Sequence, residues 1–170
     1  MSHSTIPAAM RVGAVLALCS ILFGFVLGGV FGFNEAAIKD RLAASGDAVV
    51  ATAYQGDTAA RDRVVAKSWE YLKRAHMHGG GIGAAALGAI AMMTLMTGMG
   101  TLPRLSAVAV GAGALIYSAF WMFAGFKAPG LGSTDAAKDS LAFLAVPGAG
   151  LSLLGMLGAI VSVVQGRRAG

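Results

Sequence analysis

The sequence predicts an all-α integral membrane protein, a bundle of four transmembrane helices with an amphipathic helical segment outside the membrane. Composition is the first observation: hydrophobic residues make up 56% of the 170-residue chain and charged residues only 12%. A soluble domain carries about 25% charged residues. Such a chain has too little polar surface to cover a water-soluble globule, so we expect lipid to cover part of it.

Four apolar runs are the second observation, at 12–33, 79–102, 105–126 and 140–164. None of them contains Asp, Glu, Lys, Arg or His. At about 1.5 Å per residue, each helix reaches about 30 Å or more, the thickness of the hydrocarbon core. Lipid cannot satisfy free backbone groups, so each run is expected to be helical. We expect one membrane domain over 1–170.

The segment 34–78 between the first two runs is expected to be helical and to lie outside the membrane. Asn34 is a suitable N-cap for a short helix over 35–44 that Gly46 would end. Asp57 is suited to cap a second helix over 58–78, which would lie on the membrane surface or continue as a stalk into the second run. One apolar stripe marks this second helix: Val65, Trp69, Leu72 and His76.

The distribution of charge is the third observation. The N-terminal segment, the turn at 101–104 and the C-terminal segment are purely basic, while the two other connections hold all eight acidic residues. The positive-inside rule therefore predicts that both chain ends are cytoplasmic and that 34–78 and 127–139 face outward. The many Lys and Arg residues of 34–78 leave the inverted orientation as the alternative. An Ala- and Gly-rich composition indicates a bacterial inner membrane. The excess of Lys and Arg over Asp and Glu is attributed to topology and not to nucleic-acid binding.

Small residues spaced by four mark two of the runs. Gly24, Gly28 and Gly32 follow this pattern on the first run, and Gly155 and Gly158 begin it on the fourth. Small residues at this spacing let helix backbones approach closely. They are interpreted as packing positions, either within the bundle or against a second copy or another membrane subunit.

The only constellation with recognisable chemistry is the stretch 74–83, in which His76 and His78 precede a run of glycines. Imidazole ligates haem iron, copper and zinc, and the glycines leave room for a flat macrocycle or a neighbouring helix against the backbone. The run Ala75-His76-Met77-His78-Gly79 resembles the His-x-His helix start of membrane proteins related to haem–copper oxidase subunit I and to nitric-oxide-response proteins. The resemblance implies a redox or haem context, with haem b as the candidate cofactor, although the other histidines of those families are absent here.

Helix geometry restricts this site. Residues two apart on a helix point about 200° apart, so His76 and His78 cannot clamp one ion on a regular helix. Met122, at a similar depth on the third run, is the expected axial partner within the chain. A histidine from a second chain is the alternative axial partner. Of the two histidines, His76 is expected to be the more important ligand. The alternatives are an interfacial histidine without a ligand and a site for a quinone or lipid head group.

Several function classes are disfavoured. The runs contain no ionisable residue of the kind that ion-coupled transporters use, and no hydrolase or zinc-protease motif is present. An enzyme is therefore not expected. The preferred interpretation is a non-catalytic subunit or accessory protein of a larger membrane complex, such as a respiratory or photosynthetic redox complex. The alternative is a haem- or metal-binding electron-transfer protein that uses His76 and His78.

Overall fold

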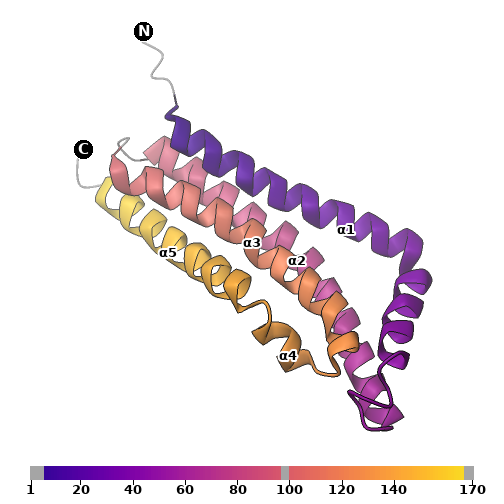
Figure 1. The fold of residues 1–170 in the computed structure, drawn as a ribbon. Coiled ribbons are helices and arrows are strands. Elements are labelled where there is room, and N and C mark those ends of the chain that lie inside the picture. The colour runs from indigo at the N-terminus through magenta and orange to yellow at the C-terminus, as the bar shows by residue number, and fades with distance from the viewer. Residues whose placement is uncertain (1–5, 97–99, 167–170) are drawn as a thin grey trace.

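The computed structural model describes residues 6–96 and 100–166, and over these residues the chain is helical with no strand. A short α4 separates the last two of the long helices (Figure 1). The helices are α1 (Ala8–Asp47), α2 (Thr58–Met96), α3 (Thr101–Leu131), α4 (Thr134–Asp139) and α5 (Ala142–Gly166).

Helices α1, α2, α3 and α5 are long and apolar enough to cross a membrane. They indicate a multi-pass membrane protein, and their arrangement fits the predicted four-helix bundle. Helix α1 begins and α5 ends at the same end of the bundle, here called the proximal end (Figure 1). The opposite end, where α1 ends and α2 begins, is called the distal end.

The four long helices are not packed equally. Helices α1, α2 and α3 all contact one another, whereas α5 lies along α3 and contacts α2 over a shorter stretch. Among the residues that the structure describes, no Cα atom of α5 comes within 8 Å of one in α1. One side of α5 is therefore open, and it is the least covered of the four.

The predicted helix after Asn34 is present as the distal part of α1: Asn34 has non-helical φ −130° and ψ 22°, and a second helical segment runs from there to Asp47. The two segments meet at a kink, and the side chain of Asn34 bonds back to the first segment instead of capping the second. Its side-chain Nδ2 donates to the carbonyl oxygen of Val30 at 3.3 Å. Such side-chain competition for a helical carbonyl is a recognised cause of bending, and α1 bends visibly in its distal part (Figure 1).

Helix α2 begins where the sequence indicates, because Asp57 Oδ1 accepts a hydrogen bond of 2.8 Å from the backbone N–H of Ala60. This is N-cap geometry. The helix then runs without a break through the glycines at 79–81 for 39 residues, or about 58 Å. That length exceeds a bilayer core, so the stalk alternative for 58–78 fits and the surface-lying one does not.

Three boundaries differ from the sequence prediction. The expected turn at 101–104 is already the first turn of α3, where Pro103 is tolerated because no N–H is needed there. Helix α3 continues past 126 to Leu131, and α4 occupies part of the expected loop 127–139. The fourth apolar run is helical as α5 from Ala142 to Gly166.

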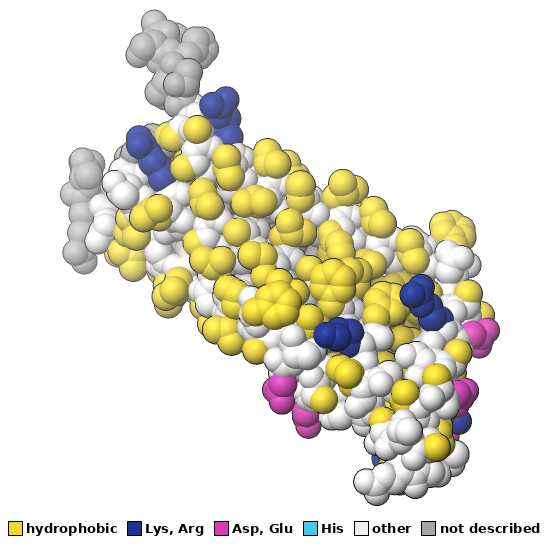
Figure 2. All heavy atoms as spheres, viewed as in Figure 1, with side chains coloured by type: hydrophobic (Ala, Val, Ile, Leu, Met, Phe, Trp, Pro, Cys, Tyr) yellow, Lys and Arg dark blue, Asp and Glu magenta, His cyan; other side chains and the backbone are white. Residues whose placement is uncertain are grey.

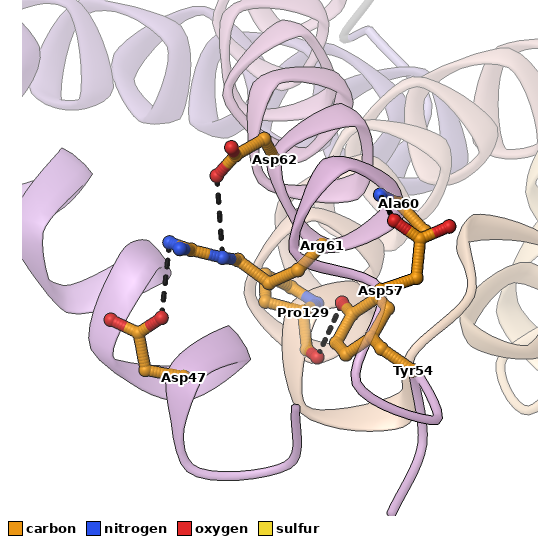
Figure 3. A network of polar contacts seen from close by, with 7 residues as sticks. All are labelled: Asp47, Tyr54, Asp57, Ala60, Arg61, Asp62 and Pro129. Atoms are coloured by element: carbon orange, nitrogen blue, oxygen red, sulfur yellow. Dashed lines mark hydrogen bonds and ion pairs between the residues drawn. The ribbon is translucent and has the colours of Figure 1, made fainter. Parts of the chain in front are cut away.

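The connection between α1 and α2, called here the distal hairpin, is held by polar contacts to α3 and between the two helices themselves (Figure 3). The buried Tyr54 hydroxyl donates to the carbonyl oxygen of Pro129, in the last turn of α3, at 2.8 Å. Arg61 Nη1 pairs with Asp47 Oδ1 at 3.0 Å and so joins α2 to α1. Burial raises the pKa of Tyr54, against the opposing charge of Arg61. The distal hairpin is therefore held as an ordered part of the fold.

Candidate functional site

His76 lies on the side of α2 that faces α1. Its Nδ1 is 2.7 Å from the carbonyl oxygen of Gly24. A carbonyl can only accept, so Nδ1 carries the proton and Nε2 is unprotonated in the neutral ring. The imidazole lies over Gly28, where a Cβ would fall 2.7 Å from Cε1 of His76. Phe31 contacts the ring edge-on, with centroids 6.4 Å apart.

Small residues continue this α1–α2 contact toward the proximal end. Ser20 Oγ donates to the carbonyl oxygen of Gly79 at 3.1 Å. A Cβ at Gly24 would fall 2.6 Å from the backbone nitrogen of Gly80, so only glycine fits at this separation. Gly24 and Gly28 thus pack within the chain. Gly32 does not share the contact: it is exposed, and a Cβ there would meet no atom within 4 Å.

The glycines of the fourth apolar run lie against α3. A Cβ at Gly155 would overlap the backbone of Val110, and one at Gly158 would overlap the Ser106 hydroxyl. Both positions are therefore used for α3–α5 packing inside one chain. These contacts account for the close approach of the two helices.

His78 faces a different neighbour from His76. Its ring stacks on Tyr117 of α3, with centroids 5.4 Å apart and planes inclined by 21°. Trp121 approaches the same ring at 6.3 Å. The two histidines therefore diverge, one toward α1 and the other toward α3, as expected for a regular helix.

Met122 is not brought to either histidine. It packs at the edge of the apolar cluster that contains Phe120 and Trp121. Over 6–96 and 100–166, no three His, Cys, Asp or Glu residues are grouped so that they could hold a metal ion. His76 contacts α1 through Gly24, His78 stacks on Tyr117 of α3, and Met122 of α3 lies at the edge of that apolar cluster.

An aromatic cluster with one cation fills the distal part of the α2–α3 contact. The Arg74 guanidinium carbon lies 4.4 Å from the Trp121 ring centroid and 5.5 Å from that of Tyr71. Tyr71 and Trp121 meet edge-to-face at 4.9 Å. Arg74 makes no ion pair within 4 Å in the described part of the chain. Its charge is therefore held over the rings without a carboxylate partner.

An open groove of about 460 Å³ lies beside this cluster, between α3, α4 and the first turns of α5. Tyr117 and Trp121 line one side of it, and α4 contributes one cation and one carboxylate. Apolar side chains of α5 complete it. The α4 residues are Lys138 and Asp139.

The polar side chains in and beside this groove differ in whether they have an ion-pair or hydrogen-bond partner. Lys138 Nζ pairs with Asp135 Oδ1 at 2.7 Å, and that hydrogen bond raises the pKa of the lysine. Asp139, like Arg74, has no ion-pair partner within 4 Å among the described residues. Trp121 Nε1 is buried without an acceptor from the residues described, although a buried indole N–H normally has one.

Sequence reasoning missed this groove, whereas it expected the glycines after His78 to leave room for a macrocycle or a neighbouring helix. Gly79 and Gly83, four residues apart on α2, carry the same small-residue signal as Gly24 and Gly28 and pack against α1. The groove has no comparable local signal, since its residues come from three helices. Arg74 and Trp121 are 47 positions apart in the sequence, and only the α2–α3 contact joins them.

Comparisons of the chain with protein-family models, with curated proteins and with solved structures give no match.

Proposed function

We propose that this protein is a non-catalytic subunit or accessory protein of a larger membrane complex in a bacterial inner membrane, with both chain ends in the cytoplasm. Respiratory and photosynthetic redox complexes are the expected kind of assembly. The observation that carries this proposal is the open side of α5. This helix is attached along α3 alone for most of its length and presents an apolar surface away from the bundle.

The exposed residues of α5 are spaced for helix packing. They recur at alternating steps of three and four, the spacing of a coiled-coil seam, and all four large side chains are more than half exposed. The stripe, called here the α5 seam, consists of Leu153, Leu157, Ile160 and Val164. Lipid is as apolar as leucine, so association in a membrane depends on such close side-chain packing.

A hollow next to the α5 seam supports the same proposal. A groove of about 250 Å³ lies between α2 and α5 near the proximal end, bordered by Met92, Met156 and two residues of the seam. A side chain from a neighbouring helix could enter this groove as a knob enters a hole. Figure 2 shows one face of the molecule, where hydrophobic side chains cover the long middle part and charges gather toward its ends.

The experiment compares the size of the native assembly in membranes extracted with a mild detergent. The wild-type protein is expected to migrate with an assembly much larger than a 17.1 kDa monomer in its micelle. Leu157→Ala should release it, while its own unfolding transition stays unchanged. Leu18→Ala, at an exposed position of α1, is the matched control and should leave the assembly intact. A wild-type protein that remains monomeric under in-membrane crosslinking would overturn the proposal.

The second candidate function is haem or metal binding for electron transfer. One observation favours it: metal-ligating histidines usually donate their other ring N–H to a carbonyl or carboxylate, and His76 does so to Gly24. The second ligand would have to come from another chain. An absorption spectrum of the purified assembly decides this, because a haem Soret band that His76→Ala abolishes supports it and a colourless assembly excludes it.

A further inference from the structure

The groove between α3, α4 and α5 combines features of a lipid head-group site. Its polar end carries Lys138 and Asp139, and its apolar end runs along Val146 and Ala149 of α5. The ring of Trp121 forms part of its wall. Tryptophan and tyrosine are enriched where membrane helices reach the head-group level. A groove that is charged at one end and apolar at the other suits an amphiphile.

The charges at the polar end select the kind of head group. Asp139 of α4 lines the groove, and Arg74 lies beside it, over the ring of the lining residue Trp121; neither has an ion-pair partner within 4 Å in the described chain. Lys138 is already paired with Asp135. One cation and one carboxylate thus stand outside any close ion pair, although Glu70 and Lys138 act on them at longer range. Together this cation and this carboxylate complement a zwitterion better than a purely anionic head group.

We propose that this groove binds a zwitterionic phospholipid with a primary amine, of the phosphatidylethanolamine class. The lipid phosphate accepts hydrogen bonds from the guanidinium of Arg74, and its ammonium donates to the carboxylate of Asp139. One acyl chain lies along Val146 and Ala149. The proposal rests on insertion of the four helices in a bilayer and is independent of the α5 seam.

The test uses Trp121 as its own reporter. The chain has two tryptophans, so Trp69→Phe leaves Trp121 as the only one. This variant is reconstituted in phosphatidylglycerol vesicles that contain increasing fractions of a lipid with brominated acyl chains, which quench nearby indole fluorescence. Brominated phosphatidylethanolamine should quench at a mole fraction about fivefold lower than brominated phosphatidylcholine or phosphatidylglycerol, the scale of one favourable surface ion pair.

Two substitutions then assign the charges. Asp139→Asn should remove the preference for phosphatidylethanolamine, because the ammonium loses its partner. Arg74→Gln should weaken quenching by all three lipids. Asp40→Asn and Lys127→Gln remove exposed charges on α1 and α3 away from the groove and should change nothing.

Several results would overturn the proposal. Equal quenching by the three lipids would show ordinary lipid contact. Preference for phosphatidylcholine would show that the aromatic rings, and not Asp139, receive the head-group cation. If inorganic phosphate alone protects the fluorescence of Trp121 from quenching by brominated lipid, the groove is a phosphate site and not a lipid site. If Trp69→Phe fails to fold, native mass spectrometry of the delipidated wild type with the same three lipids gives the comparison, and absence of a phosphatidylethanolamine preference there refutes the site.

Discussion

The imidazole Nδ1 of His76 donates a hydrogen bond to the backbone carbonyl oxygen of Gly24, with 2.7 Å between the two atoms. The bond is possible because Gly24 and Gly28 have no side chains, so α1 approaches α2 closely enough for the ring to reach the backbone. The histidine singled out by the sequence for ligand chemistry is thus, first of all, a link between two helices.

Loss of this link should destabilise the fold. In His76→Phe an aromatic ring is kept and the donor is lost, so the free energy of unfolding should fall by at least about 0.5–2 kcal/mol, the scale of hydrogen bonds between membrane helices. The larger phenyl ring adds packing strain against Gly28. Unfolding of the purified protein in mixed micelles, followed by circular dichroism, measures the loss. His78→Phe keeps the stacking on Tyr117 and should cost less. Equal losses for the two variants would contradict a specific role of the His76 hydrogen bond.

Alanine at Gly24 should separate α1 from α2. The new Cβ would lie 2.6 Å from the backbone nitrogen of Gly80, which cannot move aside as a side chain could. Overpacking of this kind costs about 1–3 kcal/mol, measured as a lower melting temperature in detergent. Gly32→Ala is the matched control on the same helix, because its Cβ meets no atom. It should leave stability unchanged or raise it by up to about 1 kcal/mol through helix propensity.

Alanine at Gly132 should be costly for a different reason. Gly132 ends α3 with φ 69°, a left-handed conformation that costs an L-residue about 1–2 kcal/mol. A Cβ there would also lie 2.6 Å from the Cβ of Ala53. Gly81→Ala, in a helical and open position of α2, is the control and should stabilise the protein. A melting temperature for Gly132→Ala at or above that of the wild type would refute the prediction.

Alkaline pH should weaken the distal hairpin through Tyr54. Burial raises the pKa of this tyrosine above its ordinary value of about 10, so the folded state keeps the proton after the unfolded state has lost it. The stabilisation is complete below about pH 10 and declines as the pH rises through the folded pKa. The stability difference between wild type and Tyr54→Phe, measured by denaturant unfolding, should therefore shrink from neutral pH to beyond pH 10. A difference independent of pH would show that the hydroxyl does not titrate with unfolding.

The sequence by itself determined the elements that depend on local pattern. Four uncharged runs of sufficient length give four helices long enough to cross a membrane, and Asp57 marks the start of α2 because an N-cap is a local interaction. Helix periodicity also predicted that His76 and His78 diverge. The helix start after Asn34 was also predicted, but not the role of its side chain, which is equally able to cap the new segment or to bond a carbonyl of the preceding turn.

Only the tertiary structure decided which partners these elements meet. Gly24 and Gly32 carry the same local signal, yet one lies against Gly80 and the other has no neighbour, because α1 diverges from α2 toward its kink. Arg74 meets Trp121, and Tyr54 meets Pro129, across distances that no periodicity encodes. Such contacts depend on how far helices approach and rotate against each other, which is set by the sum of many small packing contacts and not by any single run of residues.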